Sequence, residues 1–205
     1  GETLRLLGRH REASTMLTAT QRWLARRGED LLLADALVER ADAYLALQDL
    51  RSARRDLDAA SALLAHERSS LSPLRRPAFA DASARVVEQS IRVDLAEGDS
   101  IAALARLEEA AAKTLRELQR TTTDRGGRHA MASPPRLEQL PSVDGEALRY
   151  AVLDDEVLIW HLRAGHTTLH RVPLQRRELH ALVRNAVAAF RQRESQSDGF
   201  RRLGD

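Results

Sequence analysis

The sequence contains no cysteine. A disulfide framework, a zinc site built on thiolates and a thiol nucleophile are therefore excluded for this chain. Aromatic residues make up only 3% of it, and lysine occurs once, at Lys113. The 32 Lys and Arg residues nearly balance the 30 Asp and Glu residues, which gives a formal net charge of +2. This balance produces no strong field that would favour nucleic acid or an acidic partner.

Long apolar runs are also missing. No segment approaches the roughly 20 residues that a helix needs to span a bilayer. The chain opens at Gly1 without an initiator methionine or an apolar signal-like segment. We therefore expect a soluble, cytoplasmic protein with no membrane partner, and we interpret the chain as part of a longer protein.

Motifs that carry chemistry are scarce. No glycine-rich phosphate loop of the GxGxxG or GxxxxGK kind is present. Three histidines lie close in sequence, which invites a metal site: His161, His166 and His170. On a hairpin that turns at Ala164-Gly165, His161 would face a position near Thr168 and His170 one near Ile159, so the histidines do not converge and no carboxylate joins them. We predict no catalytic residue, no cofactor and no metal.

The first 120 residues are rich in Ala, Leu, Arg and Glu, which favour helices. They contain a weak internal repeat, in which a turn is followed by a helix with small residues where a neighbour would cross. Its three copies run through Leu7-Gly8, Glu12-Ala13, Leu17 and Thr20; through Ala41, Tyr44, Gln48-Asp49-Leu50, Ala53, Leu57 and Ala60; and through Ile91, Gly98-Asp99-Ser100, Ala103, Leu107 and Ala110.

This repeat resembles the tetratricopeptide (TPR) repeat, in which small side chains let antiparallel helices approach closely. The anchors Ala13, Ala53 and Ala103 are 40 and 50 residues apart, compared with about 34 in a regular TPR array. Longer connections would explain the difference, and residues 69–77 (SSLSPLRRP) are predicted to be an extended loop. An ordinary Ala- and Leu-rich bundle, which gives some of the same coincidences, is the alternative.

A linker is predicted at residues 121–135, after a helical pattern that ends near Leu118. The segment reads TTTDRGGRHAMASPP, and its threonines, adjacent glycines and prolines disfavour a helix. Arg125-Gly126-Gly127-Arg128 is also compatible with a fragment of an RNA-binding Arg-Gly tract. One copy without aromatic partners favours a flexible joint.

Three strands and one helix are predicted in residues 136–205. Leu148, Tyr150 and Val152 alternate with polar or small residues, as in a strand with one buried face. The apolar run 157–160 predicts a strand that is covered on both faces, and the β-branched segment 167–172 predicts a third strand. The helix from Gln175 onward carries its apolar residues on one face, which we expect to pack on the sheet: Leu179, Leu182, Val183, Ala186 and Phe190.

The order of elements from Glu138 to Arg193 resembles the opening of a CHAT domain, a caspase-like cysteine peptidase domain that is found behind TPR repeats. The shared features are a leucine-bearing helical turn that ends at a proline, a Leu-x-Tyr strand, an acidic turn, an apolar strand, a third strand that ends in Val-Pro-Leu, and an amphipathic helix. The resemblance implies a mainly parallel sheet with flanking helices, and a catalytic His and Cys at the ends of later strands.

The family motifs that carry those catalytic residues, a His-Gly pair and a Ser-Ala-Cys-like segment, are absent from this chain. No catalytic residue can therefore be assigned, and the chain alone cannot perform cysteine proteolysis.

The predicted fold is α+β overall. Residues 1–120 form TPR-like helical hairpins, residues 121–135 a linker, and residues 136–205 a small β-meander plus helix that begins a caspase-like α/β domain.

The leading functional hypothesis is the N-terminal part of a TPR–CHAT protein. Its repeats would bind a protein or peptide, and the remainder of the CHAT domain would complete the peptidase. A non-enzymatic TPR-type adaptor is the second hypothesis. A regulatory domain that contacts nucleic acid through its arginines is the third, and the small net charge disfavours it.

Overall fold

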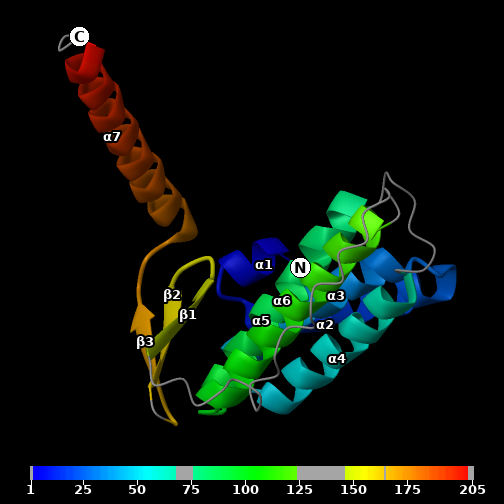
Figure 1. Cartoon of the computed structure of the whole chain (residues 1–205). Helices are drawn as coiled ribbons and strands as arrows, with labels where there is room; N and C mark the ends of the chain where they lie inside the picture. Colours follow the sequence, from blue (N-terminus) through cyan, green and yellow to red (C-terminus); the bar gives the residue numbers. More distant parts are fainter. Residues whose placement is uncertain (1, 68–75, 124–145, 164, 203–205) are drawn as a thin grey trace. The chain divides into compact units, whose positions relative to one another are not determined.

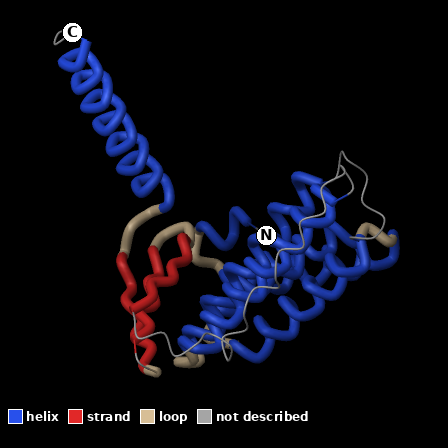
Figure 2. The backbone as a smooth tube through the Cα atoms, in the orientation of Figure 1, coloured by secondary structure: helices blue, strands red, loops and turns tan. Residues whose placement is uncertain are grey.

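The computed structural model describes residues 2–67, 76–123, 146–163 and 165–202. It contains seven helices and one antiparallel sheet of three strands within those residues, which confirms the α+β prediction (Figures 1 and 2). The chain divides into two compact units, Gly1–Gln139 and Leu140–Asp205. The first contains the helices α1 to α6, and the second contains the sheet and α7.

The helical unit is a series of long helices joined by short corners. The six helices are α1 (Glu2–Leu6), α2 (His10–Arg27), α3 (Asp30–Ala46), α4 (Leu50–Glu67), α5 (Arg76–Ala96) and α6 (Ser100–Thr123). Each helix contacts the next one along the chain, and α3 also contacts α5. Contacts between alternate helices are expected when helical hairpins stack on one another.

Four corners of this unit share one backbone geometry. Gly8, Gly28, Gln48 and Gly98 adopt φ values of 71°, 65°, 60° and 83°. In each case the N–H of that residue donates to the carbonyl three residues back, and the next N–H donates to the carbonyl five residues back. This is the Schellman arrangement, which satisfies the last carbonyls of a helix and turns the chain sharply.

The helices that follow two of these corners are capped in the same way. Asp49 accepts a hydrogen bond from the N–H of Ser52 at 3.1 Å, and Asp99 accepts one from the N–H of Ala102 at 2.8 Å. Such N-caps satisfy a backbone donor that the helix itself leaves unpaired. The hydrogen bonds from Ser52 lower the pKa of Asp49, because they favour the charged carboxylate.

The alanines of the sequence repeat occupy equivalent positions near the start of three helices. Ala13, Ala53 and Ala103 each lie five residues after the left-handed residue of a corner, and each is the fourth residue of its helix. All three are 0% exposed. The main apolar core surrounds the second of them and draws on α2, α3, α4 and α5, with Leu37, Leu57 and Val93 among its members. The predicted role of these alanines in close packing is therefore confirmed.

Two boundaries differ from the prediction. The helix α6 continues through Thr123 instead of ending near Leu118, because threonine lowers helix stability by only a fraction of a kcal/mol per residue, about 0.7 at most. The helix α5 begins at Arg76, inside the predicted loop 69–77, and Pro77 occupies its first turn, where a missing N–H costs nothing. The predicted joint at 124–135 and the loop residues 69–75 lie outside the described residues.

The sheet is a meander of β1 (Glu146–Val152), β2 (Val157–Arg163) and β3 (His166–Val172). The middle strand is the most buried, as its apolar run predicts, with Leu158 and Trp160 both 0% exposed. Glu156, at the turn before it, forms two hydrogen bonds of 2.8 Å with the guanidinium of Arg171 on β3.

The predicted buried face of the first strand is wrong. Leu148 is 64% exposed and Tyr150 is 70% exposed, whereas Ala151 is buried. Ala151 pairs with Leu158 across the ladder, and paired residues share one face of a sheet. The burial therefore follows the face of Leu158 and Trp160, and the larger apolar residues of β1 lie on the opposite face.

The helix α7 (Arg176–Arg202) does not cover the sheet as expected. Its apolar side chains are exposed, which corrects the predicted packing: Leu182, Val183, Val187 and Phe190. Its first residue is tied to β1 and to the turn that follows it, because the N–H of Arg176 donates to the carbonyl of Asp154 at 2.9 Å and its guanidinium donates to the carbonyl of Val152 at 3.0 Å. Amphipathic spacing predicted the helix correctly but not what its apolar face contacts.

The corner residues give a first testable prediction. Gln48 is the one described non-glycine residue at positive φ, a conformation that costs an L-residue about 1 kcal/mol or more. We expect Gln48→Gly to raise the free energy of unfolding of the helical unit by about 1 kcal/mol. Gly98→Ala should lower it by a similar amount, since only backbone strain opposes the new methyl group, which meets no atom within 4 Å.

Urea unfolding followed by circular dichroism measures both changes. Gln48→Ala is the matched control and should not stabilise the protein, because it keeps a Cβ atom at the same φ. A Gln48→Gly variant that unfolds at lower urea than the parent would contradict the interpretation.

Candidate interaction face

Three acidic residues form a stripe along one side of α3. Asp35, Glu39 and Asp42 follow one another at intervals of four and three residues, which places them on one side of the helix. The other sides of α3 are buried, because it contacts α2, α4 and α5. Within the stripe, the side chain of Asp35 is 49% exposed, compared with 20% for Glu39 and 27% for Asp42.

Arginines from two other helices contact this stripe. Arg5 of α1 lies 2.9 Å from the Asp42 carboxylate and 3.7 Å from that of Glu39. Arg85 of α5 contacts Asp35 at 2.8 Å and also pairs with Glu39. We call this set of five residues the α1–α3–α5 face.

The positive and negative charges of this face largely balance, and the pKa of one of its carboxylates is shifted. Burial raises the pKa of Asp42, with nearby Glu39 acting in the same direction, while Arg5, Arg92 and His10 oppose the shift. Five charged groups thus lie within reach of one another on half-buried positions. The ion pairs between these groups hold their side chains in place.

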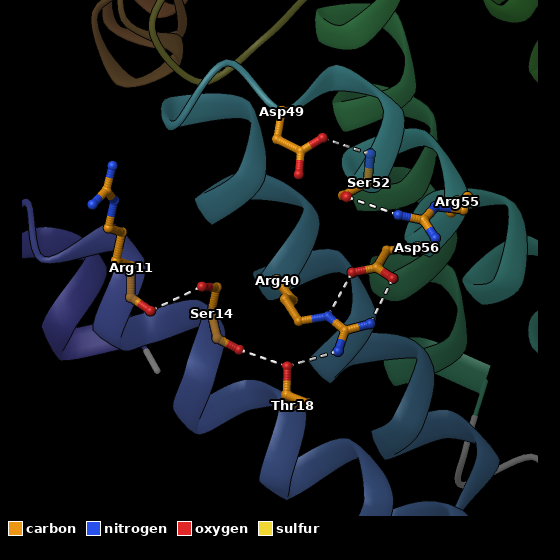
Figure 3. Close-up of polar contacts among 8 residues, drawn as sticks. All are labelled: Arg11, Ser14, Thr18, Arg40, Asp49, Ser52, Arg55 and Asp56. Atoms are coloured by element: carbon orange, nitrogen blue, oxygen red, sulfur yellow. Dashed lines mark hydrogen bonds and ion pairs between the residues drawn. The ribbon is translucent and has the colours of Figure 1, made fainter.

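A second, more buried ion pair joins α3 to α4. Arg40 donates two hydrogen bonds of 2.7 Å to the carboxylate of Asp56 and a third, of 2.9 Å, to the hydroxyl of Thr18 on α2 (Figure 3). The side chains of Arg40 and Asp56 are only 13% and 9% exposed. Three successive helices therefore meet at one guanidinium, whose pKa the Asp56 hydrogen bonds raise further.

An equivalent polar joint connects α4, α5 and α6. Asp94 is 1% exposed and accepts hydrogen bonds from Arg54 on α4, at 2.6 Å, and from Arg106 on α6. Arg54 also contacts Glu97 at 2.6 Å. These pairs fix one hairpin against the next. A shift that separated Asp94 from its arginines would leave a buried carboxylate without a partner, and this would strongly destabilise the protein.

The sequence did not reveal these ion pairs. Each partner lies between 12 and 50 residues from the other, and a chain with 32 basic and 30 acidic residues offers many pairings. One signal was available, namely the spacing of Asp35, Glu39 and Asp42 on a helix that is otherwise apolar. A polar stripe on a largely buried helix indicates that polar side chains of neighbouring helices meet it there.

The predicted register of the histidine hairpin is confirmed. His161 pairs with Thr168, and Ile159 pairs with His170. One detail is wrong, because a carboxylate does contact His161: its Nε2 lies 3.1 Å from Glu146. Among the residues with described positions, no group of three or more His, Cys, Asp or Glu side chains could hold a metal ion.

Comparisons with protein-family models, with curated proteins and with solved structures give no significant match. In the described part of the chain, no helix is both long and apolar enough to cross a membrane.

The Arg40–Asp56 pair predicts a non-additive pair of mutations. Arg40→Met leaves a buried carboxylate without its guanidinium and should destabilise the helical unit by about 3 kcal/mol. The double variant Arg40→Met, Asp56→Leu removes both charges and should recover most of that loss, because it abolishes the desolvation cost of the pair. A double-mutant cycle in urea measures the coupling, and purely additive single changes would refute the role of this pair.

The raised pKa of Asp42 predicts that the stability of the helical unit depends on pH. Because the folded-state pKa of Asp42 is raised, its contribution to stability is complete below the unfolded pKa, about 4, and is lost as pH rises through the folded value. Asp42→Asn should therefore gain stability relative to the parent between about pH 3 and pH 7.

Asp49→Asn provides the matched control, since the pKa of Asp49 is lowered. The stability of this variant relative to the parent should fall as pH rises toward about 4, the unfolded pKa, and stay constant above about pH 5. Urea unfolding at a series of pH values measures both variants. Parallel trends for the two would show that the burial of Asp42 has no effect on stability.

Proposed function

We propose that the helical unit is a TPR-type module that binds a protein or peptide. We also propose that the second unit is the opening part of a CHAT-type, caspase-like cysteine peptidase domain. In this proposal the repeats act as a sensor, and the catalytic His and Cys belong to the remainder of that domain. The activity of the parent protein would be that of a cysteine endopeptidase controlled by ligand binding.

The observation that carries the binding function is the regular geometry of the hairpins. Equivalent corners at Gly8, Gln48 and Gly98 precede equivalent, fully buried alanines. Regularly stacked hairpins build an extended surface to which several helices contribute, and this suits binding of an extended segment. The α1–α3–α5 face draws its side chains from three alternate helices in this way.

The peptidase part is supported by the order of elements in the second unit. The Leu-x-Tyr strand, the acidic turn, the apolar strand and the strand that ends at Val172-Pro173-Leu174 correspond to β1, β2 and β3. The exposed Leu148 and Tyr150 and the exposed apolar side of α7 would be covered by the remainder of the domain, because large apolar surfaces are rarely left in contact with water.

A non-enzymatic adaptor is the alternative function. It uses the same α1–α3–α5 face, and it assigns no chemistry to the second unit. It is favoured if the chain that follows Asp205 supplies no nucleophile and base.

Selection of peptides from a displayed library tests the binding function. We expect enriched peptides to bind the chain and to lose about ten-fold in affinity when Asp35→Arg reverses one charge of the face. Asp58→Arg, at an exposed position of α4, is the matched control and should leave binding unchanged. Isothermal titration calorimetry measures both. Equal effects of the two substitutions would reject the face as the binding surface.

The peptidase part is tested on the source gene. We expect the reading frame after Asp205 to continue for about 100 residues or more and to supply a His-Gly pair and a cysteine after apolar strands. Substitution of that cysteine by alanine should abolish peptide cleavage by the full-length protein. A stop codon close to Asp205, or cleavage that survives the substitution, would leave the adaptor as the function.

A further inference from the structure

Polar atoms without a partner within the described residues gather at the α1–α3–α5 face. Four buried side-chain atoms of this kind belong to the face or lie beside it: Arg5 Nε, His10 Nδ1, Glu39 Oε2 and Gln89 Oε1. His10, the first residue of α2, lies beside the face, since its charge acts on Asp42. Because buried polar atoms are normally paired, such a cluster is a candidate site for a polar group of a ligand.

The position of Gln89 follows from its neighbours on α5. It comes four residues after Arg85 and three before Arg92, so the three side chains lie on one side of the helix. Arg85 pairs with Glu39, and the charge of Arg92 acts on Asp42. This side of α5 therefore faces the acidic stripe of α3, and Gln89 lies at that junction.

Arg5 and Glu39 present a donor and an acceptor side by side. Arg5 Nε lies 3.7 Å from Glu39 Oε2, which is within ion-pair range but too far for a hydrogen bond. Other atoms of both side chains are engaged, because Nη1 of Arg5 lies 2.9 Å from Asp42 and Oε1 of Glu39 binds Arg85. An incoming group thus meets one N–H and one carboxylate oxygen at this position.

The charges of the face disfavour a charged ligand here. A carboxylate of a ligand would meet Glu39, and like charges at an interface are unfavourable. An ammonium or guanidinium group would meet Arg5 and has no acceptor for its N–H. A neutral group that carries both a donor and an acceptor avoids both conflicts.

The numbers of donors and acceptors select a primary amide. Arg5 Nε is one donor, Glu39 Oε2 and Gln89 Oε1 are two acceptors, and His10 Nδ1 takes either role according to its tautomer. The backbone of one bound residue provides one N–H and one C=O, which leaves an acceptor over. The side-chain amide of Asn or Gln provides two N–H groups and one carbonyl oxygen. It also forms paired hydrogen bonds with an adjacent donor and acceptor, as it does with adenine.

We propose that the α1–α3–α5 face recognises an Asn or Gln side chain of the segment that it binds. The amide carbonyl accepts from Arg5 Nε, and the two amide N–H groups donate to Glu39 Oε2 and Gln89 Oε1. This inference rests on the binding function proposed for the face and specifies one ligand residue. The amide enters by rotation of the Arg5 side chain, which is 31% exposed, and the 3.7 Å contact that it separates is not a hydrogen bond.

Peptides selected on the full chain are the first probe. In each of them, every Asn and Gln is replaced in turn by Met, which is of similar length and has no amide. We expect one replacement to weaken binding about ten-fold by calorimetry, because it leaves polar atoms of the face unpaired.

The variant Glu39→Gln links this loss to the site. In the variant an NH2 group takes the place of Oε2 while the amide oxygen stays on Arg85. The same Met replacement should then weaken binding by only about two-fold or less. Asp35→Asn is the matched control, since it makes the same change on the same stripe at another carboxylate that pairs with Arg85. With this control the replacement should still cost about ten-fold.

Propionamide, which reproduces the end of a Gln side chain, tests the site without a peptide. NMR spectra of the isotope-labelled chain follow the Nε–H of Arg5, whose resonance is the one that Arg5→Lys removes. We expect propionamide to shift this resonance saturably, with a dissociation constant about ten-fold higher in Glu39→Gln than in the parent.

The outcomes separate this inference from the function on which it rests. Peptides that bind Asp35→Arg less well, yet tolerate Met at every Asn and Gln, would overturn the amide site and leave the binding function standing. Equal affinity of propionamide for the parent and for Glu39→Gln would also overturn it. A saturable shift with propionamide and no enriched peptide would support the amide contacts and reject the binding of an extended segment.

Discussion

Close crossing of antiparallel helices is the constraint on which the helical unit depends. Ala13, Ala53 and Ala103 are 0% exposed at equivalent points of three helices, and small side chains at such points let neighbouring helices pack closely. The chain must therefore reverse direction over very few residues. The left-handed residue at each corner achieves this and at the same time satisfies the carbonyls that end the preceding helix.

Alanine crossings bury little apolar area, and aromatic residues are scarce, so charged pairs take a large part in joining the hairpins. Arg40 links α2, α3 and α4, and Asp94 links α4, α5 and α6. Such pairs add little net stability, because desolvation offsets much of their attraction. They are selective all the same, since a slip of one helix along its neighbour would leave a buried charge unpaired. The pairs therefore help to fix the register in which the helices stack.

Local patterns predicted the helices, the corners and the strand register correctly. Gly8 and Gly98 mark corners because glycine adopts positive φ without strain, and the turn at Gly165 leads to the pairing of His161 with Thr168. Burial was harder to predict. An alternating sequence shows that β1 has two different faces, but it does not show which face is buried. It therefore could not predict that Ala151 lies inside while Tyr150 lies outside. The ion pairs of the α1–α3–α5 face were missed because their partners come from different helices.

Apolar side chains are exposed on both α2 and α7, and the internal repeat explains the first case but not the second. The apolar side of α7 has no counterpart elsewhere among the described helices, so its exposure alone does not specify what would cover it. Met16 and Trp23 of α2 are each 52% exposed. The positions 40 residues later on α4 are Asp56, which is buried and bonded to Arg40 of the preceding helix α3, and Leu63, which packs against the core. The repeat therefore explains the exposure on α2, because Met16 and Trp23 lie on the side that a preceding helix as long as α3 would cover.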